Sequence, residues 1–359
     1  MNASASSVSP DPQARDNPLG LSGFEFVEFA APDPAQLDSL FTRMGFTHVA
    51  NHRTAPLALY RQGDVNFVVH QQASGFVRDF VAAHGPCCTG FALRVDDAAA
   101  AYQHCLQRAA QAHPAAAELA IRAPALEGIG GSILYLCDHR DGTVFTSQFE
   151  FLDGVDPHPR GFGLSFIDHL THNVIDGNMG QWADFYSRLF NFYEVKYFDI
   201  KGQQTGLRSQ AMTAPDGCIS IPINESSDPK SQINEYIDQY HGEGVQHIAL
   251  YTDNIYQTVE AMHAHAVKFL DTPDTYYQVI DQRIPEHGED VDRMRENSIL
   301  IDAEPDDSSK QLLQIFTETN IGPIFFEIIQ RKGNKGFGEG NFTALFEAIE
   351  RDQQQRGVL

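Results

Sequence analysis

The stretch that decides the fold is residues 166–190, FIDHLTHNVIDGNMGQWADFYSRLF, which has the pattern of a strand, a turn and a helix. Its first nine residues form a short strand, and the turn after them contains Asp176 and Asn178. The helix follows from apolar side chains at the spacing i, i+3, i+4, i+7, namely Trp182, Phe185, Tyr186 and Leu189. One such stripe buries one helix face, so the stretch predicts a helix packed on a sheet.

The same pattern occurs four times along the chain, beginning near residues 24, 90, 167 and 247. The other three helices are marked by stripes of similar spacing at Leu37–Met44, Tyr102–Ala109 and Ile255–Met262. Strand-like runs follow each helix, so the repeated unit is one strand, one helix and about three strands. Four units indicate internal duplication and an α+β fold. The pattern leaves open that an unrelated α+β protein could show similar runs.

Length and repeats together predict two domains. The chain has 359 residues, and ordinary domains contain roughly 100–200. We expect a flexible tail over residues 1–20, an N-terminal domain over 21–152, a linker over 153–165, and a C-terminal domain over 166–359 that ends in a helix. Asp153-Gly154, Pro157 and Pro159 give the linker the composition of a connection.

Composition excludes several classes of protein. Lys and Arg total 25 against 48 Asp and Glu, and this net charge of −23 argues against non-specific binding to nucleic acid or anionic membranes. No apolar run approaches the roughly 20 residues of a membrane span. The five cysteines form no CxxC pair, so we expect reduced thiols in a cytoplasmic protein.

A glycine-rich segment, GNKGFGEG at residues 333–340, precedes a predicted C-terminal helix with Asn341 as its N-cap. It lacks GK[ST], and no GxGxxG opens a helix after a strand, so it is not a phosphate-binding loop. A flap beside a site and a plain surface loop both fit this pattern.

Three residues could hold a metal, and all lie in the second half. Glu327 lies in the apolar run PIFFEIIQ (323–330), where a carboxylate must be paired, protonated or metal-bound. His169 and His247 lie on the predicted strands 166–174 and 245–251. Aligning the halves sets them against Phe26, Gly90 and Ser147, so only the second half could bind metal. Two imidazoles and one carboxylate form the facial triad of non-heme Fe(II) oxygenases, although other metals use these ligands and lone histidines are usually structural.

Aromatic and amide side chains are expected around this trio. Gln314 and Phe316 are two residues apart on one strand and therefore share a face, as do Phe325 and Glu327. Gln246 precedes His247. Such a pocket suits a flat ring that carries a polar substituent. His172 lies on the opposite strand face from His169 and is not expected to be a ligand.

Several ordered motifs resemble the 4-hydroxyphenylpyruvate dioxygenase family, of bacterial type, within the vicinal-oxygen-chelate superfamily. The resemblance covers about residues 22–350, is densest after residue 160, and includes DHLTHNV (168–174), PINE (222–225), KSQI (230–233), QHIAL (246–250), TYYQ (275–278), LLQIF (312–316), FEIIQR (326–331) and GFGEGNF (336–342).

The resemblance implies two domains of paired βαβββ modules with a glyoxalase-like fold, each an open mixed sheet barrel with outer helices, plus a C-terminal gating helix. It implies one Fe(II) per chain, held by His169, His247 and Glu327. Catalytic roles are implied for Gln246, Gln314, Phe316 and Asn341, and substrate contacts for Ser209, Asn224, Gln232, Phe325, Phe337 and Phe342.

The expected activity is conversion of 4-hydroxyphenylpyruvate and dioxygen to homogentisate and carbon dioxide in tyrosine catabolism, by a cytoplasmic homo-oligomer, a dimer or a tetramer. One alternative is hydroxymandelate synthase, whose members carry a smaller aliphatic residue where Phe316 stands here. An extradiol ring-cleaving dioxygenase would need a catechol-binding His or Tyr base, and the Gln-lined pocket lacks an obvious one. A non-catalytic binding protein of the same fold is the third alternative, against which the complete trio speaks.

Overall fold

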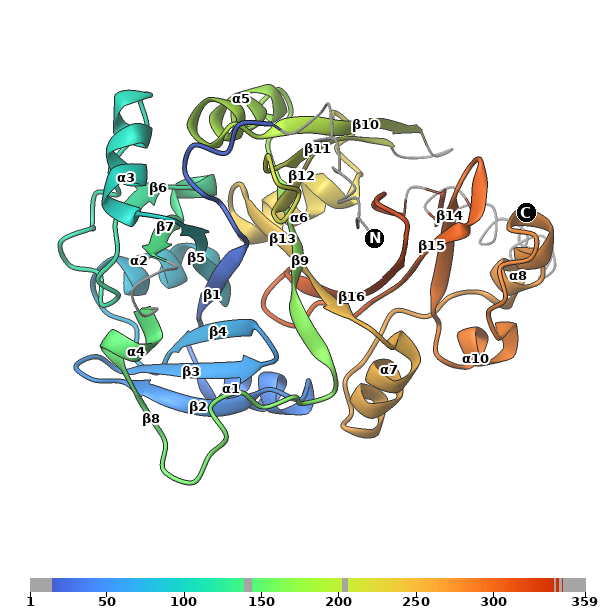
Figure 1. Ribbon diagram of the computed structural model, residues 1–359, viewed down its shortest axis with the longest axis horizontal. Coiled ribbons are helices and arrows are strands. Elements are labelled where there is room, and N and C mark those ends of the chain that lie inside the picture. Colours follow the sequence, from blue (N-terminus) through green and yellow to red (C-terminus); the bar gives the residue numbers. More distant parts are fainter. Residues whose placement is uncertain (1–14, 139–143, 202–205, 339, 342–343, 345–359) are drawn as a thin grey trace, which may run out of the picture.

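The computed structural model describes residues 15–138, 144–201, 206–338, 340–341 and 344. Strands and helices both contribute, in two curled mixed sheets with helices outside them (Figure 1). The α+β expectation is therefore confirmed. The longest described helix has 12 residues, and no described helix is long and apolar enough to cross a bilayer.

The first sheet contains eight strands in the order β6-β7-β5-β1-β4-β3-β2-β8. Its central pair, β1 and β5, is antiparallel, and each of these strands has a parallel neighbour on its other side, β4 and β7. The strands are β1 (Phe24–Ala30), β2 (Thr47–His52), β3 (Leu57–Gln62), β4 (Val65–His70), β5 (Cys87–Val95), β6 (Ala125–Glu127), β7 (Ile133–Asp138) and β8 (Phe149–Phe151).

The second sheet has the order β10-β11-β12-β9-β13-β16-β15-β14. Here β9 and β13 form the antiparallel centre, flanked by their parallel partners β12 and β16. The strands are β9 (Leu164–Asn173), β10 (Tyr193–Lys201), β11 (Gly206–Thr213), β12 (Ser220–Glu225), β13 (Gly244–Thr252), β14 (Leu300–Glu304), β15 (Asp307–Phe316) and β16 (Phe325–Lys332).

Four helices follow the first strand of each unit, as the apolar stripes predict: α1 (Ala35–Arg43), α3 (Ala98–Gln107), α5 (Met179–Phe190) and α7 (Ile255–Ala264). In α5 the stripe buries Tyr186 and Leu189 completely. Local signals set the ends: the Asp97 side chain caps α3 and the Asn254 side chain caps α7. The remaining helices are α2 (Gly75–His84), α4 (Val144–Gln148), α6 (Gln232–Tyr240), α8 (Asp274–Tyr277), α9 (Ile280–Arg283), α10 (Val291–Glu296) and the 3-10 turn η1 (Ile129–Gly131).

The second repeat departs from the expected unit. After α3 it contributes only β6 and β7 to its own side of the sheet. The chain then forms α4, and β8 pairs with β2 at the far edge. The segment 144–147, which the sequence alignment sets against the strand of Glu327, is therefore helical, and that part of the alignment is wrong.

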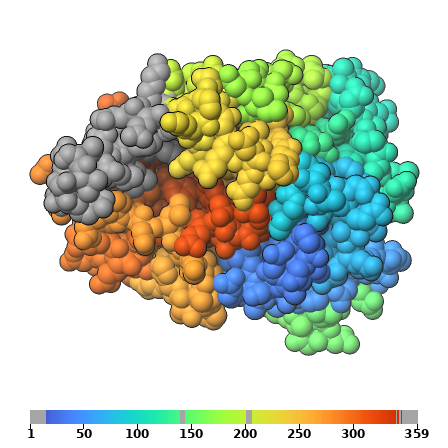
Figure 2. All heavy atoms as spheres, turned by 180° about the vertical axis from the view of Figure 1, so that it is seen from behind, coloured from blue at the N-terminus to red at the C-terminus, as the bar shows by residue number. Residues whose placement is uncertain are grey.

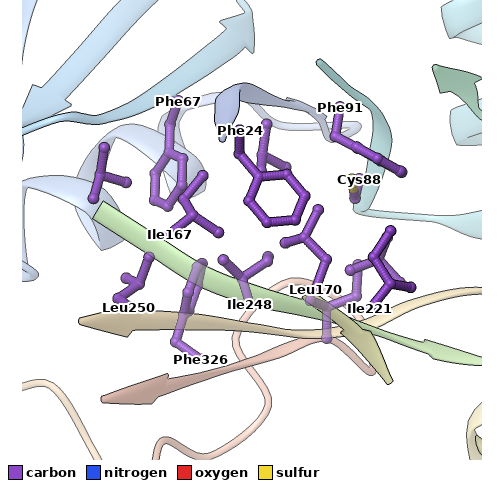
Figure 3. Packing of buried hydrophobic residues seen from close by; sticks show 14 of the residues in the cluster. Phe24, Phe67, Cys88, Phe91, Ile167, Leu170, Ile221, Ile248, Leu250 and Phe326 are labelled. Atoms are coloured by element: carbon purple, nitrogen blue, oxygen red, sulfur yellow. The ribbon is translucent and has the colours of Figure 1, made fainter. Parts of the chain in front are cut away.

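The two sheets share one hydrophobic core. Figure 3 shows Phe24, Phe67 and Phe91 from the first sheet facing Ile167, Leu170 and Phe326 from the second. The ring of Phe326 lies 5.8 Å from that of Phe67 and 6.3 Å from that of Phe41. In Figure 2 the blue first half and the yellow-to-red second half meet along a broad boundary.

We propose that the domain boundary lies between these sheets, after β8 and before β9. The connecting segment is held by Gln62, whose Oε1 accepts hydrogen bonds from the backbone of Phe162 and Leu164. The last residues of the expected flexible tail pack against the protein, because Leu19 is 6% exposed and Asn17 hydrogen-bonds to Leu21. Residues 1–14 and most of the expected C-terminal helix lie outside the described residues, although Gly340, Asn341 and Ala344 are helical.

Candidate metal centre

Three adjacent strands bring His169, His247 and Glu327 together. His169 lies on β9 and Glu327 on β16, and both face Ala249 of the intervening strand β13, which also carries His247. Nε2 of His169 is 3.2 Å from Oε2 of Glu327, and Nε2 of His247 is 3.4 Å from the same oxygen. The two Nε2 atoms are 3.4 Å apart. His169 and Glu327 are 2% and 3% exposed.

This spacing fits a metal ion. Three donors on one face of an octahedron, with bonds of about 2.1 Å, would lie about 3 Å from one another. One donor atom from each residue lies within 4.8 Å of the other two. Among the described residues, no other group of three or more His, Cys, Asp or Glu side chains has this spacing. The donor set fits Fe(II), because imidazole and carboxylate are the ligands of the facial triad.

The electrostatics of the three residues prepare them for a cation. Burial by itself would raise the pKa of Glu327, but the neighbouring His169 and His247 lower it by more than burial raises it. The pKa of Glu327 therefore falls below its usual range, and the carboxylate is ionised. Burial lowers the pKa of His169, but the Glu327 charge and the Asp168 hydrogen bond outweigh burial and raise it. In the metal-free protein His169 therefore tends to hold a proton, which a metal ion would displace.

Each imidazole has an acceptor on the side away from Glu327. Nδ1 of His169 lies 2.8 Å from Oδ1 of Asp168, and Nδ1 of His247 lies 3.0 Å from Oε1 of Gln246. An acceptor at Nδ1 favours the tautomer that leaves the Nε2 lone pair free for a metal. Sequence reasoning placed Gln246 near the site but assigned Asp168 no role, although an Asp directly before a candidate ligand is a usable signal.

Aromatic rings surround the trio as expected. The Phe325 ring stacks on His247 with a centroid separation of 4.9 Å, and Phe316 meets the same imidazole at 6.5 Å. Phe337 lies edge-on to His169 at 5.3 Å. Phe342, also expected here, lies outside the described residues. The rings form an apolar surround that would exclude water from bound substrate.

Two predicted amides are buried with unused hydrogen-bonding atoms. Gln314 and Asn341 are each 1% exposed, and Oε1 of Gln314 and Nδ2 of Asn341 have no partner among the described residues. The Asn341 oxygen accepts a hydrogen bond from the hydroxyl of Tyr276 over 2.6 Å. Gly338, at φ +74°, lies so close to the Gln314 amide that a Cβ there would clash with it. Buried unpaired amides of this kind are candidates for ligand contacts.

The predicted phenol contacts are only partly assembled. Ser209 on β11 lies directly opposite Asn224 on β12, which in turn lies opposite Asn173 on β9. Asn173 is buried with an unpaired Nδ2 and was missed by sequence reasoning, although it shares the strand face of His169. Gln232, in the first turn of α6, has an exposed side chain and is not buried with these groups.

The first sheet has a structurally matched set of positions without metal ligands. Strand register places Phe26 opposite Ala92, Glu28 opposite Gly90, and Ala92 opposite Tyr135. Phe26 and Gly90 thus match His169 and His247 as expected, but Tyr135, rather than Ser147, matches Glu327. A Cβ on Gly90 would lie 2.5 Å from the carbonyl oxygen of Ile133, so no histidine fits there without backbone movement.

His172 is a core residue on the other face of β9. It is fully buried, and its Nε2 lies 2.7 Å from the hydroxyl of Tyr186. Burial lowers the pKa of His172 to about 3. Its ordinary value is about 6.5, so below pH 6.5 the unfolded chain takes up a proton that the folded chain does not, and stability falls.

We therefore expect the stability gap between the wild type and His172→Gln to depend on pH. The wild type should be more stable at pH 7.5, because the variant loses a buried hydrogen bond and packing. That advantage should shrink by roughly 2 kcal/mol by pH 5, since one group contributes at most about 1.4 kcal/mol per pH unit. Urea unfolding of both proteins at pH 7.5, 6 and 5 measures the gap, and a constant gap would contradict the assignment.

Comparison with known proteins gives consistent matches along the chain. The family model described as hydroxyphenylpyruvate dioxygenase, N-terminal, matches residues 15–151, and that of the glyoxalase, bleomycin resistance protein and dioxygenase superfamily matches residues 166–279. The chain is 53% identical over 350 residues to 4-hydroxyphenylpyruvate dioxygenase of Pseudomonas aeruginosa, covering 96% of this chain and 97% of that one. It is also 53% identical over 350 residues to a protein of Vibrio vulnificus named Hemolysin VllY, covering 96% and 98%.

A solved structure shares the whole fold. A mutant of 4-hydroxymandelate synthase from Streptomyces coelicolor aligns with a TM-score of 0.78 at 24% identity, covering 93% of this chain and 99% of that one. At this identity the likeness speaks for the fold and not for the reaction. It agrees with the paired modules expected of the vicinal-oxygen-chelate superfamily.

Proposed function

This chain belongs to the 4-hydroxyphenylpyruvate dioxygenase family, and from that premise we propose that it converts 4-hydroxyphenylpyruvate and dioxygen to homogentisate and carbon dioxide. The observation that carries the proposal is the meeting of His169, His247 and Glu327 within 4.8 Å on three adjacent strands. Fe(II) held by these residues would supply open coordination positions for a 2-oxo acid and dioxygen, together with the redox chemistry of the reaction. The substrate carries its own 2-oxo acid, so 2-oxoglutarate is not required.

The protein residues would contribute orientation and a dry environment. Phe316, Phe325 and Phe337 would wall the substrate ring, since they already flank the two imidazoles. The unpaired Oε1 of Gln314 would accept a hydrogen bond from the substrate, and the unpaired Nδ2 of Asn341 would donate one to it. Ser209, Asn224 and Gln232 would hold the phenol, which requires the exposed Gln232 side chain to turn inward. A fixed arrangement of this kind lowers the entropic part of the barrier.

The setting of the reaction is part of the same proposal. We expect a step of tyrosine catabolism in the cytoplasm, carried out by a dimer or tetramer of this chain. Nucleic acid and membranes are not expected partners, since the net charge is −23.

The test is product identification by mass spectrometry after anaerobic loading with Fe(II). Homogentisate should form without added 2-oxoglutarate, and metal analysis should approach one iron per chain, because the first sheet offers Phe26, Gly90 and Tyr135 at the matched positions. 4-Hydroxymandelate as the main product would instead favour the synthase alternative. An absolute requirement for 2-oxoglutarate, or two irons per chain, would reject the proposal.

Phe316 should direct oxygen to the ring. Its ring lies edge-on to Phe325 at 6.0 Å and close to His247, where a rigid aromatic limits the tilt of the substrate ring. Phe316→Ile should retain iron and oxygen uptake, but divert part of the product from homogentisate to 4-hydroxymandelate. A change of about 1.4 kcal/mol in the barrier difference alters the ratio tenfold. Chromatography of both acids from one reaction measures it, and homogentisate alone at the wild-type rate would contradict the role of Phe316.

A further inference from the structure

Asp168 occupies an irregular position in β9 beside His169. The pairing with β13 passes from His169 opposite Ala249 to Ile167 opposite Leu250, so Asp168 is the extra residue of a β-bulge. A bulge re-aims its side chain relative to the regular alternation of a strand. Here the carboxylate of Asp168, 8% exposed, accepts the hydrogen bond from Nδ1 of His169.

Arg331 holds the same carboxylate and also the glycine-rich loop. Its Nε and Nη2 donate to the two oxygens of Asp168, each over 2.7 Å, in a bidentate pair. Its Nη1 donates to the backbone carbonyl of Gly336 over 2.6 Å and to that of Asn334 over 3.3 Å. One guanidinium therefore links the carboxylate beside His169 to the segment that precedes the C-terminal helix.

The loop returns to the same imidazole. Phe337 follows Gly336 directly, and its ring meets His169 edge-on at 82°. The Arg331 guanidinium lies 5.7 Å from the centre of the Phe337 ring. His169 is thus contacted at Nδ1 by Asp168 and on its ring by Phe337, and Arg331 touches both of these residues.

A purely structural explanation exists, and the first sheet shows what it would look like. Glu25 is the extra residue of the matching bulge in β1, and its carboxylate pairs with Arg94. There the next residue is Phe26, which cannot bind metal. An ion pair to a buried bulge carboxylate therefore also occurs where no metal ligand follows, and there Oε1 of Glu25 has no hydrogen-bond partner among the described residues. The contacts to an imidazole and to the glycine-rich loop belong to the second sheet.

We propose that Asp168 and Arg331 are positioning residues for the metal centre: Asp168 sets the tautomer and ring orientation of His169, and Arg331 holds Asp168 and Phe337 in place around that imidazole. The proposal rests on the proposed function only in taking His169 as a metal ligand. Partners of this kind typically change metal affinity by 10–100-fold. It follows that the loss should appear in metal binding itself, before any turnover.

The experiment measures Co(II) binding to the full-length, metal-free chain under anaerobic conditions, by visible absorption and chelator competition. Asp168→Asn keeps an acceptor for Nδ1 but no charge, and should weaken binding by about tenfold, while Asp168→Ala should approach 100-fold. Both should change the Co(II) spectrum, because the ligand geometry changes. Glu25→Gln removes the matched ion pair and should leave affinity within about twofold and the spectrum unchanged.

Three results would overturn the proposal. Wild-type affinity and spectrum in Asp168→Ala would show that Asp168 does not act on the metal site. An equal loss of Co(II) affinity in Glu25→Gln would show that both carboxylates act only through folding. Arg331→Lys keeps the positive charge but cannot bridge Asp168 and the glycine-rich loop. Wild-type Co(II) affinity and spectrum in this variant would show that Arg331 is not a positioning residue. If Asp168→Ala does not fold, the near-isosteric Asp168→Asn carries the test. Failure of the chain to form homogentisate would reject the proposed function alone, because Co(II) binding is measured without turnover.

Discussion

Glu327→Ala should abolish dioxygenase activity and iron binding together. The carboxylate supplies the only negative charge among the three candidate ligands, and its Oε2 lies within 3.4 Å of Nε2 of both histidines. Without it, a divalent cation would enter a buried site with two neutral imidazoles and no anionic ligand, because the nearby Asp168 carboxylate is already paired with Arg331. We expect a loss of at least about 1,000-fold in kcat/KM, equivalent to about 4 kcal/mol of transition-state stabilisation. Oxygen uptake and metal analysis on the same preparation measure both effects.

Companion variants separate loss of a ligand from loss of packing. Glu327→Gln preserves the volume of the side chain and should fail nearly as badly, because an amide is a poor replacement for an anionic ligand. His169→Ala and His247→Ala should behave like Glu327→Ala. His172→Gln, on the other face of the His169 strand, should retain iron and most activity. Full activity in Glu327→Ala would refute the ligand assignment.

Of the variants described, Phe326→Ala should cause the largest loss in the free energy of unfolding. Strand alternation places Phe326 on the face of β16 opposite Glu327, where it is fully buried against Phe41 and Phe67 of the first sheet. Truncating a buried phenylalanine costs about 3–5 kcal/mol, through lost transfer energy and the cavity left behind. Because this core joins both sheets, as Figure 3 shows, the loss should appear in a single unfolding transition of the whole chain.

Phe166→Ala is the matched control for this experiment. Phe166 is 43% exposed and stacks on Tyr251 at the surface of the second sheet. Its truncation should change the free energy of unfolding by less than about 1 kcal/mol. Urea unfolding followed by circular dichroism measures both variants. Equal effects of the two substitutions, or two separate transitions in Phe326→Ala, would contradict a core shared by the sheets.

Local sequence patterns were sufficient for the four helices of the repeated units. The apolar spacing of Leu37, Leu40 and Phe41 indicates α1, and the stripe through Tyr186 indicates α5. A helix repeats every 3.6 residues and a strand every two, so the face that becomes buried is written in neighbouring residues. The same alternation placed Phe325 and Glu327 on one face and set His172 apart from His169. The family motifs then pointed to activity and to the iron ligands.

Tertiary structure decided the relations between distant strands. The sequence alignment set Ser147 against Glu327, but the pairing of β5 with β7 sets Tyr135 there, because α4 and β8 depart from the repeat. Strand register depends on contacts between segments far apart in the chain, and a bulge shifts it by one residue without a clear local signal. The residues that surround the metal centre are likewise brought together by strand register. Asp168 reaches Arg331, 163 residues away, only after β9 and β16 have taken their places beside β13.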